Sequence, residues 1–255
     1  MRFKHLSFVA SARPAAREAG ARFIERYGNV PVDKADVIVA VGGDGFMLEV
    51  LHRYMALKLP IYGVNYGSIG FLMNSCGLDD LKSRLEAAEL TVLHPLRMNA
   101  TTADGGTRKA LAINEVSLLR ETSQSAKIKV SVDDQVRLEE LMCDGVLLST
   151  PAGSTAYNYS AHGPILPIDA NVLALTPISA FRPRLWRGAL LPRTAVVRFD
   201  ILKGDHRPVS AVADNEEVRG VTAVTISEAP EFDLLLLFDD GHSLEERVTR
   251  EQFEV

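Results

Sequence analysis

Hydrophobic residues over the first 95 positions follow two alternating spacings, which predict strands and helices in turn. Short runs of consecutive apolar residues, typical of strands buried on both faces, precede segments whose apolar residues recur at helical spacing. The expected strands are residues 5–11, 36–42 and 60–65, and the expected helices are residues 12–28, 46–57 and 77–90. In the last helix, Asp79 and Asp80 are expected in the first turn, where the helix dipole favours acids. Residues 1–95 are therefore expected to form a Rossmann-like α/β domain with a parallel sheet.

The pattern changes after residue 95, where short alternating strands are separated by turns. The stretch around Asp104-Gly105-Gly106 predicts a hairpin, and similar strand–turn–strand patterns continue to about residue 230. Residues 96–230 are therefore expected to form an antiparallel, β-rich, sandwich-like domain. The tail, residues 231–255, mixes strand and helix patterns, and the sequence leaves open whether it returns to the first domain.

Composition and charge exclude several classes of partner. The chain has 255 residues and a formal net charge of −5, which gives no general electrostatic reason to bind nucleic acid or an acidic membrane. Its apolar runs are too short for a transmembrane helix. Cys76 and Cys143 form no CxxC pair, and a reducing cytoplasm is the expected location.

A glycine-rich turn, Gly42-Gly43-Asp44-Gly45, follows the second expected strand. It is not a P-loop, and it is not a dinucleotide fingerprint because Leu48 stands where the third glycine is required. A strand that ends in glycines before a helix still presents free backbone N–H groups and a positive dipole end to an anion. A carboxylate beside bound phosphates is repelled by them unless a metal ion lies between or the carboxylate accepts a proton. From this stretch alone, Asp44 is equally well interpreted as a reactive group or as the N-cap of the helix.

Two other segments have the composition of a ligand site. Residues 144–166, "DGVLLSTPAGSTAYNYSAHGPIL", combine hydroxyl residues, glycines and two tyrosines, which suit a polar, aromatic ligand better than a core. Asn114 and Glu115 fall within an expected strand, where neighbouring side chains face opposite ways unless a bulge or the strand end brings them together. An exposed pair of this kind is common, so Asn114 and Glu115 alone indicate little.

In combination, these motifs resemble the NAD kinase family of bacterial type. The resemblance rests on residues 42–45, "NYGSIGFL" at 65–72, Asn114-Glu115 and residues 144–166. It implies transfer of the γ-phosphoryl group of ATP, with Mg²⁺ or another divalent cation, to the 2′-hydroxyl of the adenosine ribose of NAD. Because diacylglycerol and sphingosine kinases share the first motif, a lipid kinase is one alternative. A dinucleotide-binding sensor with an inactive phosphoryl site is the other.

The resemblance also implies roles for individual residues. Asp44 matches the general base, and Gly42, Gly43 and Gly45 match the phosphate-binding turn, with Gly45 also near the substrate. Phe71 matches an aromatic residue that packs on adenine, Asn114 matches a residue on the adenine side of NAD, and Glu115 and Asp144 match carboxylates that hold ribose hydroxyls. The remaining substrate-binding residues that the resemblance implies are Ala152, Thr155, Ala156, Tyr157, Asn158, Tyr159, Ser160 and Asp214.

Some positions depart from the family pattern. Phe46 replaces a usual threonine after the Gly-Asp-Gly turn, and Ala152 replaces another, so two hydroxyls are lost. Residues 176–192, "TPISAFRPRLWRGALLP", stand where many members have "PHSLSNRPLVLP". Contact with triphosphate, a subunit interface and solvent all remain open for Arg182, Arg184 and Arg187. The resemblance further implies a homodimer or homotetramer, and it leaves open whether polyphosphate replaces ATP.

Overall fold

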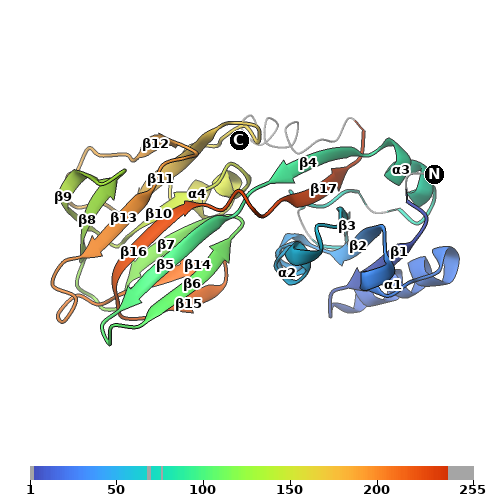
Figure 1. The fold of residues 1–255 in the computed structure, drawn as a ribbon, viewed down its shortest axis with the longest axis horizontal. Coiled ribbons are helices and arrows are strands. Elements are labelled where there is room, and N and C mark those ends of the chain that lie inside the picture. The colour runs from blue at the N-terminus through green and yellow to red at the C-terminus, as the bar shows by residue number, and fades with distance from the viewer. Residues whose placement is uncertain (1–2, 68–69, 76, 241–255) are drawn as a thin grey trace. The chain divides into compact units, whose positions relative to one another are not determined.

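The protein, described as a computed structural model over residues 3–67, 70–75 and 77–240, divides into two compact units (Figure 1). The first unit contains Met1–Leu93 and the segment from Glu231 onward, and the second contains His94–Pro230. Within the described ranges, no helix is long and apolar enough to cross a membrane.

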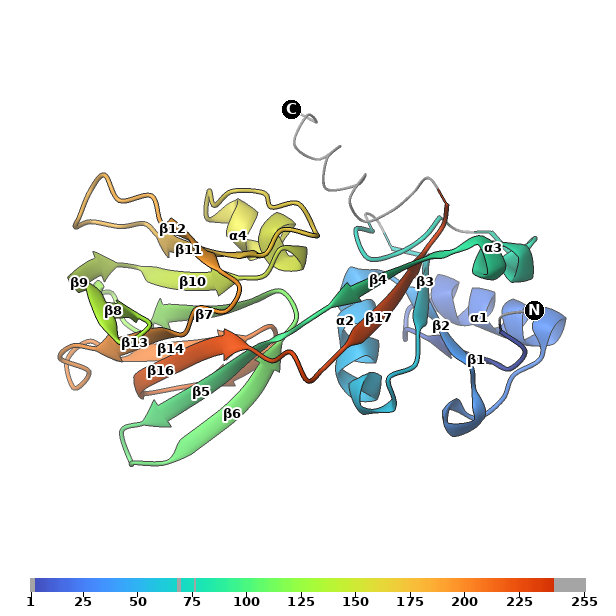
Figure 2. The ribbon, with the colours of Figure 1, turned by 45° about the horizontal axis from the view of Figure 1, so that its top comes forward.

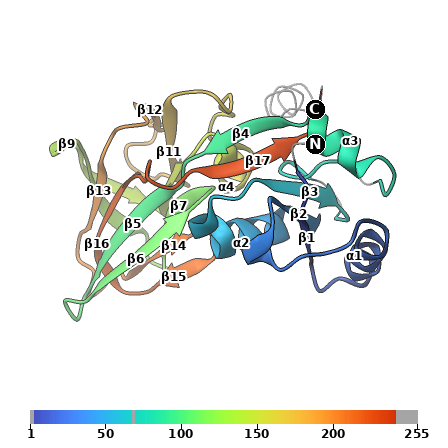
Figure 3. The ribbon, with the colours of Figure 1, turned by 45° about the vertical axis from the view of Figure 1, so that its right-hand side comes forward.

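The first unit is built on a mainly parallel sheet with the strand order β1-β2-β3-β17-β4 (Figure 3). Strands β1, β2, β3 and β17 run parallel, and β4 pairs antiparallel with β17. The strands of this sheet are β1 (Leu6–Ala10), β2 (Val37–Gly42), β3 (Ile61–Asn65), β4 (Glu89–Leu93) and β17 (Leu234–Phe238). All six residues of β2 are buried, which explains its uninterrupted apolar run.

Helices α1 and α2 lie on the same face of this sheet (Figures 1 and 2). The helices of the unit are α1 (Pro14–Tyr27), α2 (Asp44–Tyr54) and α3 (Leu81–Ala87), with 3-10 turns η1 (Val32–Lys34) and η2 (Met55–Leu57). Helix α1 begins with a proline in its first turn and ends at Gly28, whose φ of 77° favours glycine.

The prediction that α3 has acidic residues in its first turn is wrong. Asp80 is the N-cap of this helix with φ 60°, so Asp79 and Asp80 both precede the helix, and its first turn contains no acid. The left-handed backbone at Asp80 stops helical geometry from extending back over the two acids.

The second unit is a sandwich of two antiparallel sheets (Figure 2). One sheet has the order β12-β11-β10-β7-β14-β15 and the other β6-β5-β16-β13-β8-β9. Its strands are β5 (Leu96–Thr102), β6 (Thr107–Ala112), β7 (Glu115–Arg120), β8 (Ala126–Val132), β9 (Gln135–Cys143), β10 (Gly145–Ser149), β11 (Val172–Ile178), β12 (Ala189–Pro192), β13 (Val197–Ile201), β14 (Val209–Ala213), β15 (Glu216–Val218) and β16 (Val221–Glu228). The short helical turns are η3 (Ala152–Thr155) and α4 (Tyr157–Ser160).

Alternation of apolar and polar positions builds the core of this sandwich. In β5 every second residue, Leu96, Met98 and Ala100, is buried, and these residues join one apolar cluster with residues of the facing sheet such as Leu118 and Leu148. The fold class predicted from the hydrophobic pattern is therefore confirmed, with an α/β region on a parallel sheet followed by an antiparallel β-rich region.

Candidate functional site

In the first unit, the glycine-rich turn connects the end of β2 to the start of α2. The carbonyl oxygen of Gly42 accepts a hydrogen bond of 2.6 Å from the backbone nitrogen of Tyr66. A Cβ atom on Gly42 would lie 2.7 Å from Cδ1 of Phe46, and one on Gly67 would lie 3.1 Å from Cα of Gly43. The turn is therefore packed closely against its neighbours, and glycine at position 42 permits the approach of the Phe46 ring.

The carboxylate of Asp44 is held by two backbone amides from the segment after β3. The N–H of Phe71 donates to Oδ2 at 2.8 Å, and the N–H of Leu72 donates to Oδ1 at 2.9 Å. The interpretation of Asp44 as the N-cap is wrong, because Gly43 is the N-cap of α2 and Asp44 is its first helical residue. Its side chain turns away from the capping position because the two amides of residues 71 and 72 bind it. Phe71 itself is half-buried.

A cavity of about 520 Å³ opens beside this turn. Its walls are residues 11–13, residues 43–46, Glu49 and Gly67. Residues 11–13 lead into α1 and residues 43–46 begin α2, so the N-terminal ends of two helices contribute to one cavity. The helix dipoles and the Arg13 guanidinium favour an anion here, and Asp44 supplies a carboxylate at the edge.

In the second unit, Asn114 and Glu115 lie at the start of β7 rather than inside it. Glu115 is the first residue of the strand and Asn114 precedes it. The carboxylate of Asp214, which follows β14, accepts hydrogen bonds from the backbone nitrogens of Ile113 at 2.7 Å, Asn114 at 2.9 Å and Glu115 at 3.3 Å. Asp214 thereby fixes the backbone from which the two side chains project.

Glu115 is buried, and its Oε2 atom has no hydrogen-bond partner among the described residues. Burial, and to a smaller extent the neighbouring negative charge of Asp214, raise the pKa of this carboxyl from 4.5 to about 7. A hydrogen bond from the backbone N–H of Tyr157 opposes the rise. A buried acceptor without a partner is costly, so an oxygen at this position is well placed to receive a ligand hydroxyl.

Thr150 connects the Asn114 backbone to the loop that follows β10. Its Oγ1 donates to the carbonyl oxygen of Ile113 at 2.7 Å and accepts from the backbone nitrogen of Gly153 at 3.0 Å. A Cβ atom on Gly153 would lie 2.2 Å from the carbonyl oxygen of Asn114. The loop therefore packs directly against the backbone of Asn114, and only glycine fits at position 153.

The predicted residues from 152 to 160 differ in how much of them a ligand can reach. Asn158 is fully buried, and its amide is used within the chain: Nδ2 donates to the carbonyl oxygens of Ser154 and Pro164, and Oδ1 accepts from Thr176 Oγ1. The half-buried residues are Ala152, Thr155, Ala156 and Tyr157, and the exposed residues are Tyr159 and Ser160. Asn158 therefore shapes the loop, whereas the other six present surface.

Asp144 lies between β9 and β10 and forms an ion pair with Arg120, whose Nε is 2.6 Å from Oδ1. The side chain of Asp144 is 31% exposed, so a ligand can reach part of it. Arg182, Arg184 and Arg187 are exposed in the connection between β11 and β12. Asp44, Phe71 and the glycine turn thus belong to the first unit, and the other predicted site residues belong to the second.

Comparison with known proteins identifies the family. A model described as the ATP-NAD kinase N-terminal domain matches residues 10–89, and one described as the ATP-NAD kinase C-terminal domain matches residues 113–212. A protein named NAD kinase from Caulobacter vibrioides is 62% identical over 248 residues, which cover 97% of this chain and 95% of that protein. The chain belongs to the NAD kinase family. An NAD kinase from Hyphomonas neptunium is 56% identical over 97% of each chain.

Solved structures share the fold of this NAD kinase family member. Yeast NADH kinase complexed with NADH superposes with a TM-score of 0.83 at 19% identity, over 99% of this chain and 88% of that chain. An NAD kinase from Archaeoglobus fulgidus in complex with ATP superposes with a TM-score of 0.74 at 24% identity, over 98% of this chain and 97% of that chain. The resemblance to the NAD kinase family, carried by four short motifs, is therefore confirmed over nearly the whole chain.

Sequence reasoning missed three residues near the candidate site of this NAD kinase family member. Arg13 lines the cavity beside the glycine turn, Arg120 pairs with Asp144, and Thr150 holds the Asn114 backbone. Arg13 follows the first parallel strand, and ligands of α/β sheets bind at the carboxyl ends of such strands, which is a usable signal. Neither Arg120 nor Thr150 belongs to a spacing that predicts its contact.

Proposed function

We propose that this chain transfers the γ-phosphoryl group of ATP to the 2′-hydroxyl of the adenosine ribose of NAD and so produces NADP. Membership of the NAD kinase family, with matches in both halves of the chain, is the observation that carries the proposal. The lipid-kinase and inactive-sensor alternatives are not favoured, because relatives over 50% identical along nearly the whole chain are named NAD kinase.

Asp44 is proposed as the general base and Gly42, Gly43 and Gly45 as the phosphate-binding turn. The amides of Phe71 and Leu72 fix the carboxylate of Asp44 at the edge of the cavity, where it is proposed to accept the proton of the substrate hydroxyl. A positioned base contributes roughly 10²–10⁴-fold to the rate. The adjacent cavity offers two helix N-termini and Arg13 to a triphosphate, and the carboxylates of Asp44 and Glu49 at the same cavity call for a cation beside it.

The second unit is proposed to bind NAD. The buried Oε2 of Glu115, which has no partner among the described residues, and the partly exposed side chain of Asp144 suit ribose hydroxyls, because carboxyl oxygens accept hydrogen bonds from hydroxyls and an ionised carboxylate repels a phosphate. Asn114 is proposed to bond the adenine side of NAD, and Phe71 of the first unit is proposed as an aromatic residue that packs on adenine. The other proposed substrate-binding residues are Gly45, Ala152, Thr155, Ala156, Tyr157, Asn158, Tyr159, Ser160 and Asp214, with Asn158 and Asp214 acting through the backbone that they hold.

A divalent cation, Mg²⁺ in the simplest case, is proposed to arrive with ATP. Among the described residues no group of three or more histidine, cysteine or acidic side chains surrounds a common point, and the cavity offers the carboxylates of Asp44 and Glu49. Mg²⁺ is usually held by one or two carboxylates together with substrate phosphates, so this donor set fits. The ion supplies neutralisation of the charge on the transferred phosphoryl group.

Location in the cytoplasm and assembly as a homodimer or homotetramer complete the proposal. The second unit exposes large apolar side chains at Phe181, Leu185 and Leu190, and Leu185 is 89% exposed, which supports a contact with another copy. Size-exclusion chromatography with light scattering measures the assembly.

One assay tests the proposed activity. The full chain is incubated with NAD, Mg²⁺ and either ATP or polyphosphate, and NADP is quantified with an NADP-specific dehydrogenase. Diacylglycerol replaces NAD as the acceptor in a parallel reaction. NADP formation with ATP is expected; phosphorylation of diacylglycerol alone favours the lipid kinase, and NAD binding without any product favours the sensor.

A further inference from the structure

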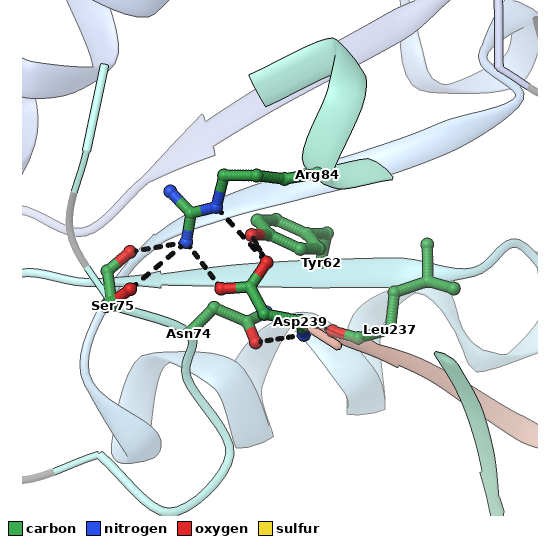
Figure 4. A network of polar contacts seen from close by, with 6 residues as sticks. All are labelled: Tyr62, Asn74, Ser75, Arg84, Leu237 and Asp239. Atoms are coloured by element: carbon green, nitrogen blue, oxygen red, sulfur yellow. Dashed lines mark hydrogen bonds and ion pairs between the residues drawn. The ribbon is translucent and has the colours of Figure 1, made fainter. Parts of the chain in front are cut away.

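A polar network in the first unit connects α3, β3 and β17 with the segment that follows β3 (Figure 4). Arg84, from α3, donates to both carboxylate oxygens of Asp239, at 3.1 Å from Nε and 2.6 Å from Nη2. Its Nη2 also donates to the carbonyl oxygen of Ser75 at 2.9 Å. The hydroxyl of the buried Tyr62 donates to Asp239 as well.

Asn74 connects the segment to both strands beside it. Its side-chain Nδ2 donates to the carbonyl oxygen of Leu237 at 2.9 Å, and its Oδ1 accepts from the backbone nitrogen of Asp239 at 2.9 Å. Its backbone pairs with β3, since Asn74 N donates to Gly63 O and Asn65 N donates to Asn74 O, each at 2.8 Å. Asn74 is fully buried, so every one of these polar groups is satisfied inside the unit.

The same segment supplies the two amides that hold Asp44. Phe71 and Leu72, whose N–H groups bind the carboxylate, come three and two residues before Asn74, respectively. The packing is tight, because a Cβ atom on Gly63 would lie 2.4 Å from the end of Met47 in α2 and 2.7 Å from the sulfur of Met73. A shift of the segment therefore moves the two amides, and the carboxylate with them.

Stability alone is a weak reason for this ion pair. The side chains of Arg84 and Asp239 are only 20% and 12% exposed. For a pair as buried as this, the free energy lost by removing two charges from water offsets most of the free energy gained from their attraction. A fully satisfied polar network instead selects one arrangement of the elements that it joins. Here the network joins the segment after β3, and the amides of that segment set the position of Asp44.

We propose that Arg84, Asp239 and Asn74 are positioning residues for the catalytic carboxylate of Asp44, acting through the amides of Phe71 and Leu72. The inference rests on the proposed function, in which Asp44 takes the proton of the acceptor hydroxyl. Misplacement of a reacting group by about 1 Å costs up to 10²-fold in rate. Loss of the network therefore lowers kcat and leaves the binding of NAD and ATP largely unchanged.

Asp239→Asn tests the proposal, since it keeps the size of the side chain and places an N–H₂ or a neutral oxygen against Arg84. The expected result is a fall in kcat of about 10- to 100-fold, with the KM values for NAD and ATP within about 2-fold of wild type. Glu228→Gln is the matched control, because it removes a carboxylate of similar exposure, 15%, from an ion pair with Arg193 in the second unit. Its kcat is expected to stay at the wild-type value.

A double-mutant cycle separates positioning from a structural role. In the Asp44→Asn background the carboxylate is absent, so Asp239→Asn is expected to change the residual kcat by less than about 2-fold. An equal loss of kcat in both backgrounds overturns the proposal, as does wild-type kcat in Asp239→Asn.

Arg84→Met, which keeps the packing of the arginine stem, replaces Asp239→Asn in the cycle if the latter does not fold. Wild-type protein that forms no NADP overturns the proposed function and this inference together, whereas active wild type with unchanged Asp239→Asn overturns the inference alone.

Discussion

Asp214 Oδ1 lies 2.9 Å from the backbone nitrogen of Asn114, although the two residues are 100 positions apart in the chain. With Ile113 and Glu115 included, three consecutive amides converge on this one carboxylate. Asp214 has φ 49°, a left-handed conformation that aspartate and asparagine tolerate better than most residues. The start of β7, with two proposed NAD-binding side chains, is thus held in place from β14.

Asp214→Ala is expected to weaken both stability and NAD binding. Three N–H groups lose their acceptor and alanine is strained at φ 49°, so the free energy of unfolding falls by about 3 kcal/mol and the KM for NAD rises. Asp214→Asn is the matched control, because it keeps one acceptor oxygen and the tolerance of this backbone, and a smaller loss is expected. Urea unfolding and steady-state kinetics measure both; equal effects of the two substitutions contradict the prediction.

Glu115 makes the folded protein less stable as the pH rises from about 4.5 to about 7. In this window the folded carboxyl keeps a proton that the unfolded chain has released, so raising the pH favours unfolding. The raised pKa corresponds to a loss of roughly 3 kcal/mol in the free energy of unfolding, which is absent below about pH 4.5 and complete above about pH 7.

Glu115→Gln removes this titration. Relative to wild type, the variant is expected to gain roughly 3 kcal/mol between pH 5 and pH 8, measured as the difference in free energy of urea unfolding. Glu139→Gln is the control, because it makes the same chemical change at an exposed position. A Glu115→Gln difference that is constant with pH contradicts the prediction.

Gly153→Ala is expected to disrupt the loop that packs on Asn114. The new Cβ would lie 2.2 Å from a backbone oxygen that cannot move independently, so a loss of about 3 kcal/mol in unfolding free energy and a raised KM for NAD are expected. Gly204→Ala is the control, because its Cβ would meet only Ile201 Cγ2 at 3.8 Å. Denaturant unfolding of the two variants decides the matter, and wild-type stability of Gly153→Ala would show that the loop adapts.

Asp44→Asn is expected to lower kcat by roughly 10²–10⁴-fold while the KM for NAD changes little, because the base is lost and the size is kept. The substitution also places an N–H₂ group against the backbone N–H of Phe71 or Leu72, so one of the two hydrogen bonds that hold the carboxylate is lost. Asp33→Asn, in the exposed turn η1, is the control and should keep wild-type kcat. Turnover of Asp44→Asn at the wild-type rate would exclude Asp44 as the base.

The fold class followed from the sequence because both kinds of sheet have a simple hydrophobic pattern. Strand β2 is an uninterrupted apolar run because it is buried on both faces of its sheet. Strand β5 alternates apolar and polar residues because it is buried on one face only. The start of α3 was mispredicted because the left-handed backbone at Asp80 depends on local chain geometry that composition does not encode.

The candidate site was only partly predictable. The motif around Asp44 was recognisable, but its partners, the amides of Phe71 and Leu72, belong to the backbone and have no residue signature. For the same reason the contact between Asp214 and Asn114 was not anticipated. Asn158 was expected at the substrate, and its amide bonds Ser154 and Pro164 of its own loop and Thr176 of β11, which are contacts that the sequence does not encode.

Strand β17 lies between β3 and β4 but is separated from both by more than 140 residues of chain. During synthesis, the first 93 residues emerge without the strand that joins the two halves of their sheet. Until that strand arrives, β3 and β4 each present an edge with open backbone donors and acceptors, which invites pairing with other nascent chains. Chaperone protection of the growing chain is therefore most needed before the last strand has left the ribosome.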